Sequence, residues 1–266
     1  MVRGFPGFLP GRDRKDLPTP DSQAAAKGNT EKARYSVMTV EERTDEAVRR
    51  IKEAAERGAA ELSLDGLQLT TIPEPLGDLT QLRTLNLNSS HLTALPECLR
   101  NLTNLSELEF RHNDLTALPE WIGELTALTW LELEYNRLTA LPESFGNLAG
   151  LACLGLHRSI SDPYLPLPDS LGSLTRLRVL DLARCGLSAL PGWMGSLTDL
   201  VVLNLYGNDL TELPSWLGDL TQLSSLSLGD NRLASLPDSM GNLTRLKDLR
   251  LNDNRLAELP DSGASF

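Results

Sequence analysis

The sequence predicts an α/β solenoid in which short parallel strands stack side by side into one sheet. Similar segments begin every 23 residues between Ala59 and Leu246, with a single step of 26. Within each segment, leucines alternate with polar residues, which is the period-two pattern of a half-buried strand. A Leu-Pro break, which is Ile-Pro in the first segment, and two more apolar residues, mostly leucines, follow in every complete segment. The chain can therefore return and bury its leucines against neighbouring segments.

The N-terminal part of the chain divides into a tail and a helix. Residues 1–38 are rich in Pro, Gly, Asp, Lys and Arg without periodicity, which predicts a disordered tail. Residues 39–58 predict a capping helix, because Thr39 and Glu42 form a capping box and Gly58 suits the C-terminal stop. Its expected apolar stripe, which would cover the first repeat, consists of Ala47, Val48, Ile51, Ala54 and Ala55.

Residues 59–266 predict one repeat domain of nine units, of which the last is cut short. The shared pattern is L-x-x-L-x-L-x-x-N-x-L-x-x-L-P-x-x-L-x-x-L-x-x, clearest in "LTWLELEYNRLTALPESFGNLAG". This pattern resembles the leucine-rich repeat family, specifically the 23-residue class of Ras-group-type intracellular proteins and small bacterial proteins. The resemblance implies a right-handed, horseshoe-shaped solenoid with its parallel sheet on the concave side.

The resemblance also implies that an Asn after each strand bonds the backbone of adjacent turns. That position holds Asn113, Asn136, Asn208, Asn231 and Asn254. Four units depart from the pattern, with Leu67, Ser90, Ser159 and Cys185. Cys and Ser are tolerable at this position, and Leu67 marks the edge unit.

Composition narrows the class of partner. The net charge of -11 disfavours sequence-independent binding of nucleic acid, which depends on Lys and Arg neutralising phosphates. No segment approaches 18 consecutive apolar residues, so we expect neither a membrane span nor a membrane partner. Three scattered cysteines favour a reducing compartment over a disulfide framework, which predicts a cytoplasmic protein.

The sequence contains no phosphate-binding loop, zinc-protease motif, paired C-x-x-C or nucleophile elbow. We therefore expect no enzyme activity, cofactor or metal. A zinc site made by His91, His112 and Asp114 is geometrically conceivable, but solvated surface side chains are the simpler interpretation. A catalytic Cys would need a site that stabilises its thiolate, and only Cys153 has a position that could face the open side.

The outward positions of the strands predict the binding site. Four consecutive units place apolar residues at the first outward position: Trp130, Cys153, Val179 and Val202. Strands about 4.8 Å apart would make these a stripe about 15 Å long. An apolar centre with aromatic residues and a charged rim is typical of protein-binding hot spots. The expected partner-binding residues are Glu107, Glu109, Trp130, Glu132, Glu134, Tyr135, His157, Arg158, Val179, Arg184, Val202 and Tyr206.

One unit carries an insertion in "HRSISDPYLPLP", where the connection to Leu-Pro takes twelve residues instead of nine. Ser161, Asp162, Pro163 and Tyr164 lie in this connection and are expected to form a rim of the site. A decayed repeat is the alternative interpretation. On the convex return, Trp121, Trp193 and Trp216 are expected to cover the layer beneath them rather than contact a partner.

These observations predict a non-enzymatic scaffold, of the kind used in signalling, that binds a protein partner on its concave face. Two alternatives remain open. The chain could be the substrate-recognition arm of a separate enzyme, of GTPase or ubiquitin-transfer type. It could also be a self-assembling structural module: the charged last strand predicts a protected end and a monomer, but a dimer through this C-terminal edge is possible.

Overall fold

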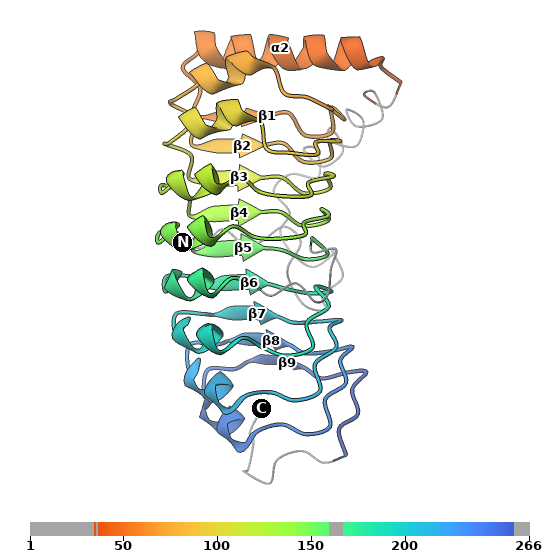
Figure 1. Ribbon diagram of the computed structural model, residues 1–266, viewed down its shortest axis with the longest axis vertical. Coiled ribbons are helices and arrows are strands. Elements are labelled where there is room, and N and C mark those ends of the chain that lie inside the picture. The colour runs from red at the N-terminus through yellow and green to blue at the C-terminus, as the bar shows by residue number, and fades with distance from the viewer. Residues whose placement is uncertain (1–34, 36, 160–166, 258–266) are drawn as a thin grey trace.

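A computed structural model describes Tyr35 and residues 37–159 and 167–257. The described part is a curved stack of strands with helix α2, Val40–Glu56, lying across its N-terminal end (Figure 1). The strands are β1 Glu61–Ser63, β2 Thr84–Asn86, β3 Glu107–Glu109, β4 Trp130–Glu132, β5 Cys153–Gly155, β6 Val179–Asp181, β7 Val202–Asn204, β8 Ser225–Ser227 and β9 Asp248–Arg250. The nine predicted units are thereby confirmed.

All nine strands belong to one parallel sheet, in which the spatial order follows the chain order from β1 to β9. The register is constant, so the first residue of each strand pairs with the first residue of the next, as Trp130 does with Cys153. The insertion between β5 and β6 leaves this register intact, because Cys153 pairs with Val179 in the same way. The structure therefore confirms the predicted right-handed solenoid with an open parallel sheet.

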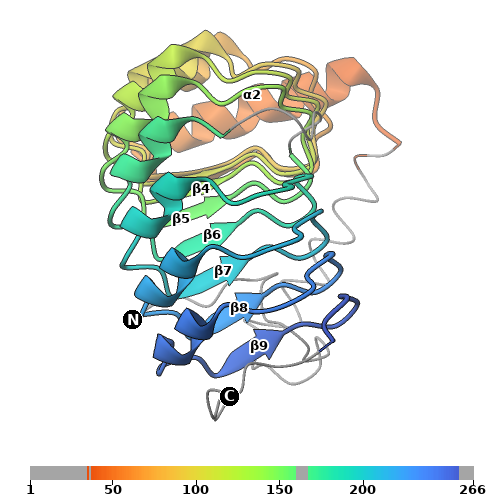
Figure 2. The same ribbon diagram turned by 60° about the horizontal axis from the view of Figure 1, so that its bottom comes forward.

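Each return segment contains a five-residue 3-10 helix that begins directly after the proline of the Leu-Pro break, and these helices form a column beside the sheet (Figure 2). The helices are η1 Glu74–Asp78, η2 Glu97–Asn101, η3 Glu120–Glu124, η4 Glu143–Asn147, η5 Asp169–Ser173, η6 Gly192–Ser196, η7 Ser215–Asp219 and η8 Asp238–Asn242. Glycine allows the closest approaches between them. A Cβ on Gly218 would lie 2.2 Å from the carbonyl oxygen of Ser239.

The leucines of the pattern fill the space between the sheet and the 3-10 helices. Leu131, Leu154 and Leu180, the middle residues of three central strands, are at most 1% exposed. Phe110 and Phe145 replace leucine at two positions and are fully buried. Each unit thus stabilises its neighbours through apolar burial, as the repeat predicts.

Helix α2 begins as its capping box predicts. The Thr39 hydroxyl accepts from the Glu42 backbone N–H at 3.2 Å, and the Glu42 carboxylate accepts from the Thr39 backbone N–H at 2.7 Å. The predicted apolar stripe is only partly right. Ala47, Ile51 and Ala54 are buried, whereas Val48 is 44% exposed and Ala55 is also exposed. The contact with the first unit is therefore narrower than the sequence indicates.

The asparagines after the strands form the predicted hydrogen-bonded ladder. The Asn208 side-chain oxygen accepts from the backbone N–H groups of Cys185 and Leu187 at 3.1 and 3.0 Å. Its amide group donates to the carbonyl oxygens of Leu182 and Leu205 at 3.0 and 2.9 Å. One side chain thus satisfies buried backbone groups of two units.

Candidate functional site

The concave face is built from rows of outward side chains that run across the strands. Residues that are 23 positions apart in the sequence become direct neighbours, because successive strands pair without offset. The first strand position supplies one row and the third position a second row. The second residue after each strand extends a third row.

The predicted apolar stripe forms in the first row. Trp130, Cys153, Val179 and Val202 are consecutive pairing partners on β4 to β7. Their exposure is uneven, since Trp130 and Val202 are partly exposed while Cys153 is 2% and Val179 is 9% exposed. The stripe is therefore continuous, but its accessible area lies mainly at its two ends.

The acidic side chains beside the stripe surround one guanidinium group. Arg111 forms an ion pair with Glu132 through Nη2, and its Nε lies 3.1 Å from Glu134 Oε2. Like charges on neighbouring strands repel each other, and the Arg111 guanidinium offsets this repulsion between Glu132 and Glu134. Glu109 accepts from the side-chain amides of Asn86 and Asn88 at 2.8 and 2.7 Å.

A further buried carboxylate, Asp181, lies at the third position of β6, in the row that also contains Glu109 and Glu132. Asp181 is 4% exposed, and its Oδ1 accepts from the Asn204 side-chain amide and the Ala183 backbone N–H, both at 2.9 Å. Together with Glu109, Glu132 and Glu134, it makes the acidic cluster, a name we keep for these four carboxyl groups. Arg111 is the single arginine among the outward positions of β3 to β7 and the second residue after each of these strands, while Arg158 and Arg184 lie one residue further on, at the edge.

Burial raises the pKa of every member of the acidic cluster. The pKa of Glu132 rises to about 7 because desolvation outweighs the Arg111 charge, with repulsion from Glu109 and Glu134 adding to the rise. The pKa of Asp181 also rises to about 7, again mainly through desolvation. Glu132 and Asp181 therefore exchange protons near neutral pH, and a cationic ligand would favour the charged forms of all four groups.

Planar side chains line the edge where the strands end. The rings of His112 and Tyr135 stack with centroids 4.3 Å apart, and Tyr135 meets the His157 ring at 5.0 Å. The Arg184 guanidinium lies 5.3 Å from the centroid of the Tyr206 ring. Desolvation, followed by the charges of nearby arginines, lowers the pKa of His157 to about 4. His157 is therefore neutral at physiological pH.

The structure brings the twelve predicted residues onto one face and its edge. Glu107, Glu109, Trp130, Glu132, Val179 and Val202 lie on the strands, and Glu134, Tyr135, His157, Arg158, Arg184 and Tyr206 follow them. The prediction omitted Arg111 and Asp181, which are central to the electrostatics. Asp181 could have been found by aligning the third strand position as well as the first. The predicted rim, Ser161 to Tyr164, lies outside the described residues.

The conceivable zinc ligands are engaged in other contacts. His91 Nδ1 lies 3.3 Å from Asp114 Oδ2, while the His112 ring stacks on Tyr135. Across the described ranges, no group of three or more His, Cys, Asp or Glu side chains is arranged to hold a metal ion. Burial raises the pKa of the Cys153 thiol, an effect opposite to what a nucleophilic cysteine requires.

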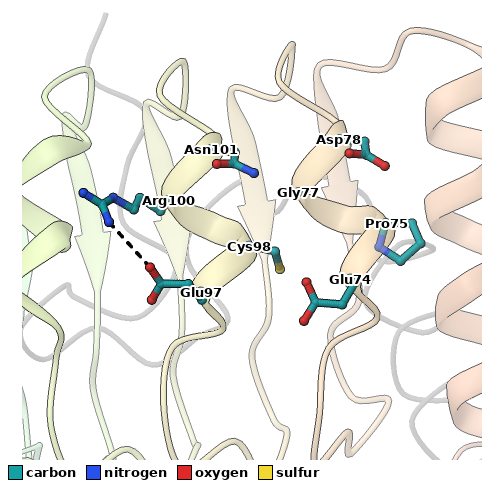
Figure 3. A pocket seen from close by; sticks show the side chains of 8 residues that line it. All are labelled: Glu74, Pro75, Gly77, Asp78, Glu97, Cys98, Arg100 and Asn101. Atoms are coloured by element: carbon teal, nitrogen blue, oxygen red, sulfur yellow. Dashed lines mark ion pairs between the residues drawn. The ribbon is translucent and has the colours of Figure 1, made fainter.

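The convex side has a shallow hollow of about 690 Å³ between η1 and η2 (Figure 3). Its lining consists of Glu74, Pro75, Gly77, Asp78, Glu97, Cys98, Arg100 and Asn101. Two of its charged groups already have partners, since Glu97 accepts from the Trp121 indole at 2.8 Å and Arg100 pairs with Glu124 at 2.7 Å. The hollow is thus part of the contact between successive helical turns.

The tryptophans of the convex layer lie as the sequence predicts. Trp121 is 7% exposed, and Trp193 and Trp216 are partly buried against the leucine core. They cover the core beneath the 3-10 helices. None of the described helices is long and apolar enough to cross a membrane.

Comparison with solved structures shows the same architecture in several proteins. The ectodomain of the Arabidopsis thaliana receptor kinase GASSHO1/SCHENGEN3, in complex with CASPARIAN STRIP INTEGRITY FACTOR 2, is 32% identical, with a TM-score of 0.67; the match covers 79% of this chain and 26% of that one. The Yersinia pestis effector YopM is 28% identical, with a TM-score of 0.67 and coverage of 90% and 62%. The plant peptide hormone receptor RGFR1, in complex with RGF2, is 33% identical, with a TM-score of 0.64 and coverage of 74% and 33%.

The chain thus spans about a quarter of the SCHENGEN3 ectodomain and less than two thirds of YopM. No curated protein matches it significantly. The family model for a leucine-rich repeat region matches residues 98–180 and 167–259, which together exceed half of the chain. With the repeat pattern, the parallel solenoid and the asparagine ladder, these matches show that the chain belongs to the leucine-rich repeat family.

Proposed function

We propose that this protein is a non-enzymatic scaffold that binds a protein partner on the concave face. The observation that carries the proposal is the continuity of three kinds of surface across β3 to β7. The apolar stripe, the acidic cluster and the edge of stacked rings meet there without an interruption in strand register. Trp130 and Tyr206, both partly exposed, are large aromatic anchors of the kind that dominate binding energy.

The comparisons support a protein or peptide as the ligand. Two of the similar plant receptors were solved in complex with CASPARIAN STRIP INTEGRITY FACTOR 2 and with RGF2, respectively. Leucine-rich repeat proteins generally use their extended surfaces for recognition of partners. We therefore assign Trp130, Val202 and Tyr206 as contact residues and the acidic cluster as the electrostatic part of the site.

The cysteines support a reducing compartment, as expected of a cytoplasmic protein. Cys98, Cys153 and Cys185 are all free thiols. The Cys185 thiol occupies the ladder position and donates to the carbonyl oxygen of Leu156 at 3.2 Å. An unpaired thiol built into the backbone ladder fits a protein that works without disulfides.

Self-assembly remains the second candidate function, because the last unit is less buried than the others. All three residues of β9 are partly exposed, whereas Leu226 of β8, at the same position as Leu249, is fully buried. The alternative recognition-arm function uses the same concave face and differs only in the identity of the partner. Light scattering over a concentration series separates self-assembly from partner binding.

The test of the proposed function compares aromatic truncations on the two faces. Partners are captured from cell extract with the wild type, with Trp130→Ala combined with Tyr206→Ala, and with Trp193→Ala as the convex control. We expect the concave variant to lose its partner, and the isolated partner to bind it at least about tenfold more weakly, since anchor truncation costs 2 kcal/mol or more. Equal binding by all three folded proteins would overturn the concave site.

A further inference from the structure

We infer that the N-terminal segment of this chain, residues 1–34, binds across the concave face and that a partner must displace it. The inference rests on the proposed function, because it makes the segment a regulator of that same site. A segment that cannot form its own core can still become ordered on a surface that complements it. Four observations support this occupant: its attachment point, its reach, its charge and the order of its residues.

The attachment point lies beside the first strand. Tyr35, which follows the segment, is 3% exposed, and its hydroxyl accepts a hydrogen bond from Arg50 Nη2. The same guanidinium donates through Nη1 to the Ser63 carbonyl oxygen at 3.1 Å. Ser63 is the last residue of β1. Arg50 therefore holds the end of the segment at the edge of the sheet that carries the site.

The reach of the segment is ample. Crossing from β1 to β7 means passing six strand spacings, or roughly 29 Å at about 4.8 Å each. An extended chain of this length spans up to roughly 110 Å. The segment can therefore lie over the whole proposed site without strain and without displacing Tyr35.

The charge of the segment is opposite to that of the face. Residues 1–34 contain seven basic residues, Arg3, Arg12, Arg14, Lys15, Lys27, Lys32 and Arg34. They contain four acidic residues, Asp13, Asp16, Asp21 and Glu31. The segment thus carries +3 in a chain of -11, which leaves -14 on the remainder. On the outward positions of β3 to β7 and the second residue after each strand, the four carboxyl groups of the acidic cluster and Glu107 outnumber one arginine, Arg111, which pairs with Glu132 and Glu134. Arg158 and Arg184 lie at the edge.

The order of residues in the segment matches the order of surfaces on the sheet. Traced back from Tyr35, the chain presents the basic residues Arg34, Lys32 and Lys27, then the basic group Lys15, Arg14 and Arg12, and only after these the apolar group Leu9, Phe8 and Phe5. Traced from β1, the sheet first presents the carboxylates of β3 and β4, and then the apolar stripe that runs on to Val202. A segment laid from β1 towards β7 therefore meets matching chemistry twice.

A basic segment would also stabilise the charged form of the carboxyl groups in the acidic cluster. Glu132 is 2% exposed and faces Arg111, Glu109, Glu134 and the Trp130 side chain. Desolvation opposes its charge, so a second cation placed there would stabilise the carboxylate. Binding of the segment should then tighten as pH rises from 6 to 8, because Glu132 and Asp181 lose protons in that range.

The first experiment uses a thiol introduced by Val202→Cys in the full-length chain as a reporter, because Val202 is partly exposed whereas Cys153 is only 2% exposed. Position 202 lies at the β7 end of the apolar stripe, next to Val179, so a bound segment shields a thiol there from an alkylating reagent. We expect Arg12→Glu, Arg14→Glu and Lys15→Glu together to raise its alkylation rate roughly tenfold, measured by mass spectrometry of each cysteine. Cys185, which serves the backbone ladder, reports any general loosening in the same sample.

A matched variant carries the same change in charge elsewhere. Lys52→Glu on α2, with Arg176→Glu and Arg245→Glu in the loops after η5 and η8, alters three exposed cations. In the Val202→Cys background, we expect this variant to leave the alkylation rate of the introduced thiol unchanged. An unchanged rate in the segment variant, or an equal rise in both variants, would overturn the inference.

The second experiment is zero-length cross-linking of amines to carboxylates in the unaltered chain. The chain has only five lysines, at positions 15, 27, 32, 52 and 247, so the linked peptides can be assigned individually. We expect Lys15 to link to Glu107 or to members of the acidic cluster. Links from Lys15 only to carboxylates outside this face would contradict the inference even if the alkylation rates changed.

These two readouts need no partner and are therefore independent of the proposed function. If the segment fails both tests while Trp130→Ala with Tyr206→Ala still abolishes partner binding, the site stands and its regulation is wrong. Suppose instead that Lys15 links to the acidic cluster but the Trp130→Ala with Tyr206→Ala variant still binds every partner of the wild type. The segment itself is then the ligand of this face, and the scaffold function is wrong.

Discussion

Carboxyl groups on the concave face lie where desolvation opposes their charge. Glu132 and Asp181 have pKa values near 7, and the pKa values of Glu109 and Glu134 are also raised. Arg111 is the counter-charge for Glu132 and Glu134, and amide side chains serve Glu109 and Asp181. Single residues thus hold a charge pattern that costs stability, because burial opposes the ionised forms of these carboxyl groups.

The raised pKa of Glu132 makes stability depend on pH. Between its ordinary value of 4.5 and about 7, the folded protein binds more protons than the unfolded chain. Its contribution to stability is therefore fully present below about pH 4.5 and is lost as pH rises through 7. We expect the wild type to lose on the order of 2 kcal/mol more than Glu132→Gln between pH 5 and pH 8.

Urea denaturation of both proteins across this pH range measures the difference. Glu107→Gln removes one carboxyl group from the same face and serves as the control, while Asp181 keeps part of the dependence in every variant. Parallel stability curves for the wild type and Glu132→Gln would contradict the prediction. A change of the same size in Glu107→Gln would show that the effect is not specific to Glu132.

At the scale of elements, the sheet and the 3-10 helices are each stabilised by their copies in neighbouring units. The glycines of the helical turns permit this, since a Cβ on Gly123 would lie 2.3 Å from the Ser144 carbonyl oxygen. Helix α2 closes the N-terminal end with a different geometry, through Ala47, Ile51 and Ala54. The buried stripe of α2 is narrow because the helix contacts only the flat end of the stack, at β1 and η1.

The two apolar side chains of α2 should therefore differ in their effect on stability. Ile51 is 2% exposed, so Ile51→Ala should lower the free energy of unfolding by about 2–4 kcal/mol. Val48 is 44% exposed, so Val48→Ala should change it by less than about 0.5 kcal/mol. Chemical denaturation of the two variants checks this. Equal losses would mean that α2 presents a different face to the first unit.

At the scale of the whole molecule, contacts run between consecutive units. The described helices and strands contact their sequence neighbours, and α2 contacts only β1 and η1 to a substantial extent. Stability in such a chain is approximately a sum of unit and interface terms. The described ends therefore differ: α2 covers β1, while β9 pairs only with β8 among the described strands.

This arrangement predicts a gradient in amide hydrogen exchange. The Asp248 N–H donates to the Ser224 carbonyl oxygen in the outermost pairing, and the Val179 N–H donates to Ala152 in the middle of the stack. We expect the Asp248 amide to exchange at least about a hundredfold faster than the Val179 amide, because the last unit opens by itself. Equal rates, measured by NMR, would indicate that the solenoid opens only as a whole.

The solenoid, its nine strands, the capping box and the asparagine ladder can all be predicted from the amino-acid pattern alone. These features repeat along the chain, and each depends on residues close together in sequence or on the same position of every unit. The five-residue 3-10 helices and the narrow stripe of α2 were decided by tertiary packing, because close contact between units selects the tightest turn and the side chains that α2 buries.

The candidate site divides in the same way. The twelve residues of the concave face and its edge follow from strand position, but the place of Arg111 between Glu132 and Glu134 and the burial of Cys153 and Asp181 do not. Their neighbours lie a full repeat away in sequence, and the desolvation that sets their pKa values arises only when the strands pair. Sequence thus decides which side chains point outward, and the tertiary structure decides which of them meet.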